Sequence, residues 1–144
     1  MSTQLLVAYD DSETSRRALS LAAAHAESDG STISIVHVLE WSPYSFLTPD
    51  ELEERHKRRG EELARAESAI TDAIKKTLGS SKVKTDLIIK YGHIADTIIS
   101  VATEVGATEI FIGRTGQSSM STRLFGSVAG SLAQMSPVPC TIVP

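Results

Sequence analysis

The sequence contains little cysteine, no long apolar run and no excess of positive charge, and each shortage excludes a class of protein. The single cysteine, Cys140, excludes an internal disulfide, and the histidines show no metal-binding spacing. A formal net charge of −4 argues against nucleic-acid binding as the main function. No apolar run approaches the roughly 20 residues that cross a bilayer, so we expect no membrane insertion.

The remaining composition is that of an ordinary folded domain. Hydrophobic residues make up 41% of the 144 residues and charged residues 22%, values near those of globular proteins. A chain of this length can bury a real core, and we expect residues 1–144 to form one domain. The N-terminus has no basic segment ahead of its apolar residues, which predicts a first strand rather than a signal peptide, and a cytoplasmic location.

Short apolar runs alternate with segments of helical periodicity along the chain. The runs predict β-strands, and the periodic segments, with their capping residues and terminal glycines, predict helices. This alternation predicts an α/β fold with an open five-stranded parallel sheet and helices on both faces. The predicted strands are 4–9, 32–39, 83–90, 109–112 and 138–143, and the predicted helices are a first one that begins between 12 and 15 and ends at 29, then 49–78, 94–105 and 128–135.

The topology directs attention to the ends of three predicted strands. In open α/β sheets, ligands bind at the carboxyl ends of the strands, near the point where the strand order reverses. Segments 8–11, 36–39 and 113–116 would end there. The sequence has neither a P-loop nor the G-x-G-x-x-G fingerprint of dinucleotide sites, so two common kinds of nucleotide site are excluded.

A group of spaced glycines follows the fourth predicted strand. Gly113 and Gly116 would let the backbone approach a ligand closely and adopt positive φ angles. Gly126 and Ser127, at the predicted start of a helix, would offer free N–H groups and a hydroxyl to an anion. The spacing alone leaves two interpretations open: a phosphate site, or glycines that merely close a strand and cap a helix.

The spacing Gly113-x2-Gly116-x9-Gly126-Ser127 resembles the G-x2-G-x9-G-[S/T] motif of the ATP-binding branch of the universal stress protein family. The similarity extends over essentially the whole chain through LLVAYDDSETSRRAL, IVHVLE, KYGHIADTII and VPCTIVP. The resemblance implies strand order 3-2-1-4-5, a homodimer, and ATP in the crevice, with ADP and AMP as alternatives. Any Mg or Mn would be held mainly by the phosphates, and we expect no metal site made by the protein alone.

The resemblance also implies which residues bind the cofactor. Asp10 would lie near the adenosine, and the backbone of Val38 would meet the edge of the adenine. Asp11 stands where many members of the family have glycine, which adds a negative charge near a site for an anion. The implied residues are Ala8, Tyr9, Asp10, Val38, Ile112, Gly113, Arg114, Gly116, Arg123, Gly126, Ser127 and Val128.

Several polar residues have ordinary structural interpretations as well. Asp10 could cap the first helix, and Arg114 and Arg123 could be surface arginines that contact no phosphate. His37 in the second strand is expected to be a packed histidine rather than a base. The aromatic residues of segment 41–47 could form a lid or pack within their own loop.

We expect a nucleotide-dependent regulatory or stress-response protein without robust catalysis. The glycine-rich loop has no lysine and no clear base beside it, so no catalytic residue is assigned. Two alternatives remain: a slow ATP hydrolase or phosphotransferase that uses Asp10 or Asp11, and a dimeric adaptor for a partner protein such as a membrane transporter. The last strand would lie at the sheet edge, where two copies could pair antiparallel and bury Val138, Ile142 and Val143.

Overall fold

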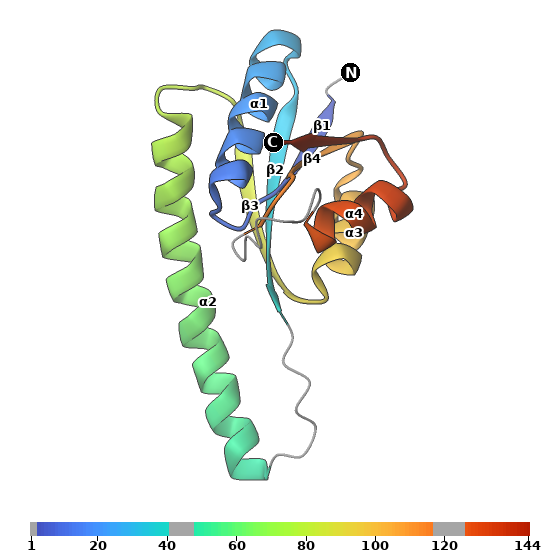
Figure 1. Ribbon diagram of the computed structural model, residues 1–144. Helices are drawn as coiled ribbons and strands as arrows, with labels where there is room; N and C mark the ends of the chain where they lie inside the picture. The colour runs from blue at the N-terminus through green and yellow to red at the C-terminus, as the bar shows by residue number, and fades with distance from the viewer. Residues whose placement is uncertain (1–2, 41–47, 117–125) are drawn as a thin grey trace.

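Strands and helices alternate along the chain in the computed structural model, which describes residues 3–40, 48–116 and 126–144 (Figure 1). The five strands of these residues form one parallel sheet in the order β3-β2-β1-β4-β5, which confirms the predicted fold class and strand order. The strands are β1 (Gln4–Ala8), β2 (Thr32–Glu40), β3 (Thr85–Gly92), β4 (Glu109–Gly113) and β5 (Cys140–Val143). The helices are α1 (Glu13–Asp29), α2 (Pro49–Leu78), α3 (Ile94–Val105) and α4 (Ser127–Met135).

The centre of the sheet is covered on both faces. β1 and β4 pair with each other, and residues 5–8 and 110–113 are buried. Such continuous apolar runs are typical of parallel strands that have helices on both sides. Leu5 packs in a cluster with residues of α1 and α2, whereas Leu6 packs in a cluster with residues of α3 and α4. Figure 1 shows the same arrangement, with one pair of helices on each side of the sheet.

Prolines shorten the last strand. β5 begins at Cys140 rather than at residue 138. Pro137 and Pro139 flank Val138 and have no backbone N–H to donate to a sheet. Ser136 closes a turn here instead, because its hydroxyl donates to the carbonyl of Val138 and accepts from the amide of the same residue. β5 is therefore a short edge strand beside β4.

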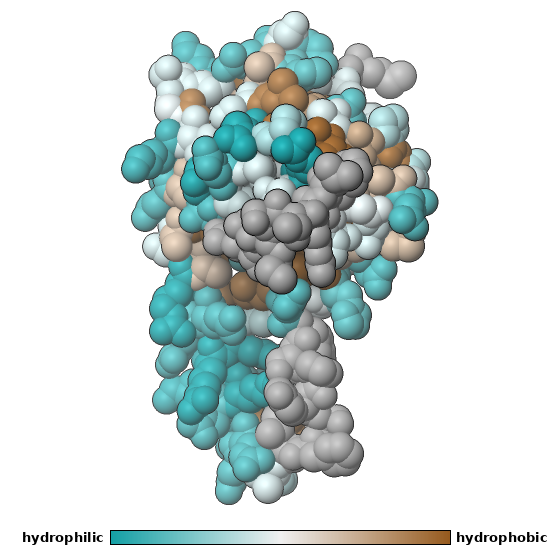
Figure 2. Space-filling view, in the orientation of Figure 1, coloured by the Kyte–Doolittle hydropathy of each residue, from teal (hydrophilic) through white to brown (hydrophobic). Residues whose placement is uncertain are grey.

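α2 is the longest helix of the described residues and continues beyond the sheet (Figure 1). It begins with a capping box, in which Thr48 and Glu51 each accept from the amide of the other, and Pro49 occupies its first position. Its buried residues are Ile70 and Ile74, and its projecting half is hydrophilic on the face shown in Figure 2. Within the described part of the chain, no helix has both the length and the apolar character needed to cross a bilayer.

Tyr91 of β3 supports α2 at the point where the helix leaves the sheet. Its hydroxyl donates to a carboxylate oxygen of Glu62 at 3.1 Å. The guanidinium carbon of Arg59 lies 5.3 Å from the centroid of the Tyr91 ring, a cation–π contact. These contacts join α2 to the end of β3.

Candidate functional site

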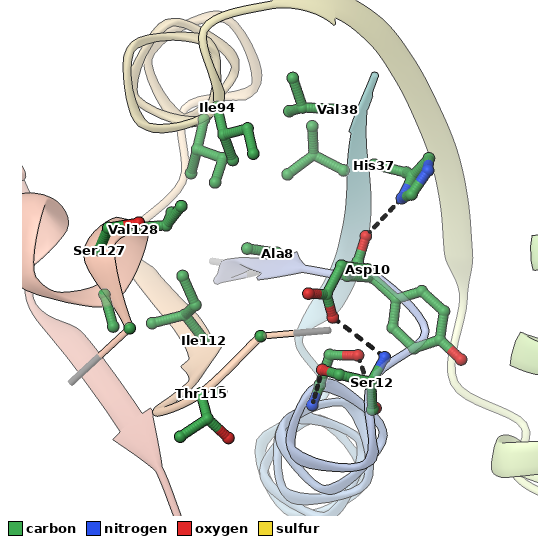
Figure 3. Close-up of a pocket in the computed structure, with 18 of the residues that line it drawn as sticks. Ala8, Asp10, Ser12, His37, Val38, Ile94, Ile112, Thr115, Ser127 and Val128 are labelled. Carbon is green, nitrogen blue, oxygen red and sulfur yellow. Dashed lines mark hydrogen bonds between the residues drawn. The ribbon is translucent and has the colours of Figure 1, made fainter. Parts of the chain in front are cut away.

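A cavity of about 470 Å³ lies at the carboxyl ends of β1, β2 and β4, where the strand order reverses (Figure 3). Its volume is in the range of small-molecule sites. It has an apolar end near β2 and α3, and a polar end near the first turns of α1 and α4. This is the position in which the topology predicts a ligand.

The cavity exists because neighbouring strands have different lengths. The β1–β2 pairing ends with Ala8 opposite Val36, and the amide of Tyr9 then donates to the carbonyl of Val36 at 2.9 Å. The β2–β3 pairing continues through His37 to Glu40. β2 therefore extends beyond β1, and its last residues form one wall of the cavity.

Side chains from four elements line the apolar end. Val38 of β2, Ile94 of α3, Ile112 of β4 and Val128 of α4 surround the same space in Figure 3. An aromatic ring placed there would have its apolar surface removed from contact with water, which favours binding. The apolar end can therefore accept a planar ring.

Two helix N-termini form the polar end. At α1, Ser12 is the N-cap, and its hydroxyl accepts from the amide of Ser15 at 3.2 Å. At α4, the N-cap is Gly126, which provides no side-chain cap. The first amides of α4 and the dipole of this helix favour an anionic group beside Ser127.

Gly113 allows β4 to approach the first turn of α1. A Cβ at this position would lie 2.7 Å from the Cβ of Thr14 and 2.8 Å from its carbonyl carbon, so no side chain fits. The hydroxyl of Thr14 also donates to the carbonyl of Thr115. The prediction that Gly113 and Gly116 adopt positive φ angles is wrong, and the absence of a Cβ is what position 113 requires.

The other two glycines of the motif bring residues 114–116 against the start of α4 and the end of β1. The amide of Gly126 donates to the carbonyl of Arg114 at 2.6 Å, and a Cβ on Gly126 would lie 3.1 Å from that oxygen. A Cβ on Gly116 would lie 3.1 Å from Oδ2 of Asp10. The spacing of the glycines therefore follows from close contacts within the protein itself.

The two aspartates after β1 have different orientations. Asp10 lines the cavity, and its Oδ1 accepts from the amide of Ser12 at 3.0 Å. Asp11 has a φ of 61°, and its carboxylate accepts from the hydroxyl of Tyr9 at 2.9 Å and from the guanidinium of Arg16 at 3.2 Å. Burial, followed by the hydrogen bond to Asp11, raises the pKa of Tyr9 to about 12. The charge of Asp11 is thus paired with Arg16, and Asp11 is not among the residues that line the cavity.

The cavity brings together the residues predicted from the sequence, with two exceptions. Arg114 is exposed and does not line the cavity, and its backbone instead donates to Val143 and accepts from Gly126. Arg123 lies outside the described residues, as do the aromatic residues of segment 41–47. The predicted residues that line the cavity are Ala8, Tyr9, Asp10, Val38, Ile112, Gly113, Gly116, Gly126, Ser127 and Val128.

Further residues line the cavity that the sequence did not single out as ligands. Ile94 and Ile98 lie one helical turn apart in α3, a spacing that predicts core packing and gives no sign of a ligand. Glu40 offered a weak signal, because it is a polar residue at the end of a strand. The additional lining residues are Ser12, Ser15, Val36, His37, Leu39, Glu40, Ile94, Ile98, Thr115 and Ala129.

The charges of the described cavity are acidic. Asp10 and Glu40 are the carboxylates among its lining residues, and within residues 3–40, 48–116 and 126–144 no lysine or arginine lines it. In the same ranges, no group of three or more His, Cys, Asp or Glu side chains is placed to hold a metal ion. This part of the cavity would therefore hold an anion through backbone amides and helix dipoles.

Comparison with known proteins gives matches over the whole chain. The model of the universal stress protein family matches residues 1–144. The chain is 30% identical, over 139 residues, to the "Universal stress protein in QAH/OAS sulfhydrylase 3'region" of Thermus aquaticus, with 96% of each chain covered. Among solved structures, universal stress protein UspA from Lactobacillus plantarum matches with a TM-score of 0.83 and 22% identity, over 99% of this chain and 97% of that one.

Two further structures with the same fold are described as nucleotide complexes. A universal stress protein in complex with cAMP matches with a TM-score of 0.71 and 20% identity, over 99% of this chain and 96% of that one. The universal stress protein from Archaeoglobus fulgidus in complex with dAMP matches with a TM-score of 0.65 and 18% identity, over 100% of this chain and 98% of that one.

Proposed function

Because the chain belongs to the universal stress protein family, we propose that its cavity binds an adenine nucleotide, with ATP as the main ligand and ADP and AMP as alternatives. The bound nucleotide would control a regulatory or stress-response protein that has no robust catalysis. Residues 1–144 would act as one nucleotide-binding domain in the cytoplasm.

One observation carries this proposal: a single cavity joins an apolar end to a polar end built from helix N-termini. The adenine ring would lie among Val38, Ile94 and Ile112, and the phosphates would lie beside Gly126 and Ser127. The ligands named for the two nucleotide complexes, cAMP and dAMP, are both adenine nucleotides and support this choice of base.

The acidic residues of the cavity favour a nucleotide that arrives with a cation. Asp10 and Glu40 line the cavity, and the triphosphate of ATP is itself strongly negative. Mg or Mn bound to the phosphates would reduce this repulsion, and Arg114 and Arg123, which the sequence predicts to bind the cofactor, are the cations to test by substitution. We expect ATP to bind more weakly when the divalent cation is removed with EDTA, as measured by calorimetry.

Titration calorimetry with ATP and Mg²⁺ tests the proposal, and Gly126→Ala tests the site. The added methyl would lie 3.1 Å from the carbonyl oxygen of Arg114, a tight contact that requires the backbone beside the start of α4 to move by a few tenths of an ångström. We expect the affinity for ATP to fall about tenfold, equivalent to about 1.4 kcal/mol. Gly60→Ala is the matched control, because a Cβ there meets nothing within 4 Å. The site is wrong if both variants bind as the wild type does, and the function is wrong if the wild type binds no ATP at millimolar concentration.

A slow ATP hydrolase or phosphotransferase is the competing function, and the position of Asp10 is the observation in its favour. Its carboxylate lies at the cavity, where it could orient a water molecule or accept a proton. Incubation with ATP and Mg²⁺ for several hours, followed by chromatography of the nucleotides, separates the two functions. Multiple turnovers that Asp10→Asn abolishes would favour the enzyme.

We also propose a homodimer through β5 and a protein partner, for which a membrane transporter is one candidate. A dimeric adaptor that holds no nucleotide is the alternative. Mass spectrometry of the freshly purified and then denatured protein distinguishes these states. Co-purified adenine nucleotide would contradict an empty adaptor.

A further inference from the structure

His37 contacts the backbone at the end of β1. It is the first residue of β2 after the pairing with β1 ends. Its Nδ1 lies 2.7 Å from the carbonyl oxygen of Tyr9. Figure 3 shows its ring on the opposite side of β2 from Val38, with the bond running to the end of β1. The ring thus reaches the peptide that precedes Asp10 from the side away from Val38.

The partner of this ring nitrogen determines where its proton lies. A carbonyl oxygen can only accept, so Nδ1 of His37 is the donor. In the neutral ring, the contact therefore requires the Nδ1–H tautomer.

The turn after β1 needs anchors because it contains an unfavourable backbone angle. Asp11 has a φ of 61°, in the left-handed region that residues other than glycine rarely adopt. On the helix side, Nη1 of Arg16 donates to the carbonyl of Asp11 at 2.6 Å and to its carboxylate at 3.2 Å. On the strand side, His37 donates to the carbonyl of Tyr9. Asp10 lies between these two anchored positions.

We propose that His37 is a positioning residue for the nucleotide site: by fixing the peptide between Tyr9 and Asp10, it directs the carboxylate of Asp10 into the cavity. Gly116 shows how closely this direction is set, because a Cβ there would lie 3.1 Å from Oδ2 of Asp10. A rotated peptide would move the carboxylate against that backbone or out of the cavity. This inference rests on the proposed nucleotide function, and its test separates the two.

Two substitutions distinguish the hydrogen bond from the bulk of the ring. His37→Leu removes the donor, whereas His37→Asn keeps an N–H close to the position of Nδ1. We expect the dissociation constant for ATP with Mg²⁺ to rise about tenfold in His37→Leu and to return to within about threefold of the wild type in His37→Asn. Calorimetry measures both.

Ser34→Ala is the matched control on the same strand. Ser34 is buried near the amino-terminal end of β2, bonds with Gln4 at 2.6 Å and Asp86 at 2.9 Å, and does not line the cavity. We expect this variant to melt at a lower temperature and to bind ATP as the wild type does. Equal loss of affinity in Ser34→Ala and His37→Leu would overturn the inference, because it would indicate a general effect of stability.

NMR of the ligand-free chain gives a readout that does not depend on ATP. We expect the Nδ1–H tautomer of His37 in long-range ¹⁵N spectra. The amide signals of Asp10, Asp11 and Ser12 should move in His37→Leu and return in His37→Asn. An Nε2–H tautomer, or unmoved amide signals in His37→Leu, overturns the inference.

The two readouts together separate failure of the site from failure of the positioning. If the wild type binds no ATP, the proposed function is wrong, while the amide signals still decide whether His37 holds Asp10. If the wild type binds ATP and His37→Leu moves the signals without changing the dissociation constant, the proposed function stands and the positioning role of His37 is wrong.

Discussion

At the scale of single residues, the turn after β1 shows how the charge of Asp11 is kept out of the cavity. Asp11 occupies a left-handed backbone position, the conformation that glycine adopts most readily. Aspartate tolerates that conformation better than most residues. Its carboxylate is bonded to the hydroxyl of Tyr9 and paired with Arg16, and it does not line the cavity.

Tyr9 makes the stability of the fold sensitive to alkaline pH. Burial, and then its bond with Asp11, raises the pKa of Tyr9 from 10.0 to about 12. A raised pKa in the folded state contributes stability that is complete below the unfolded pKa, near 10.0, and is lost as the pH rises toward about 12. We expect the free energy of unfolding to fall by up to about 2 kcal/mol over this interval through Tyr9. Urea denaturation across this range should show a shallower fall in Tyr9→Phe, and parallel profiles would contradict the prediction.

At the scale of elements, sequence signals predicted the fold wherever those signals were local. The bounds of α2 follow from Thr48 and Pro49 at its start and Gly79 at its end, and α3 ends at Gly106 as predicted. The extent of β2 was underestimated, because the pairing of Glu40 with the end of β3 depends on tertiary contacts. Local chemistry therefore determined the helices, whereas pairing partners determined the strand ends.

The sequence predicted where the candidate site lies, but not the contacts that form it. The sequence located the carboxyl ends of three strands and the glycine motif, and the cavity lies there. It did not reveal that Gly113 packs against Thr14, because residues so distant in sequence have no visible relation before folding. Nor did it reveal the role of Ile94, whose helical spacing is that of a core residue.

The contact between β4 and α1 gives a test at this scale. Gly113→Ala would place a Cβ 2.7 Å from the Cβ of Thr14 and force the two elements apart. We expect the free energy of unfolding to fall by about 1–3 kcal/mol, the usual cost of overpacking. Gly130→Ala in α4 is the matched control: its Cβ meets nothing within 4 Å, and it should stabilise the helix by about 0.5–1 kcal/mol. Urea denaturation measures both, and a Gly113→Ala variant as stable as the wild type would show that the contact relaxes freely.

At the scale of the whole molecule, the sheet has an edge at β5 that suits self-association. The amide of Arg114 donates to Val143, so the backbone groups of the adjacent residue Ile142 face the open edge. Val143 is buried in one chain with residues of α1, which corrects the expectation that it would be buried by a dimer. Val138 and Ile142 are only partly buried and remain the candidates for that interface.

Analytical ultracentrifugation tests the proposed dimer. We expect the wild type to sediment as a dimer at micromolar concentration and Ile142→Pro to shift it to the monomer, because proline removes the outward N–H of the edge strand. Leu52→Lys is the control: Leu52 is 46% exposed on the projecting half of α2, and its substitution should leave the dimer intact. A monomeric wild type, or an equal effect of both substitutions, would argue against pairing through β5.

The unequal reach of the first two strands bears on how this architecture can diverge over generations. The cavity forms because β1 ends before β2 does: the β1–β2 pairing stops at Ala8, whereas β2 continues to Glu40 beside β3. A related chain with a longer first strand could fill the cavity and keep the same strand order. The ligand and the fold can therefore change independently, and related proteins with the same fold need not bind the same ligand.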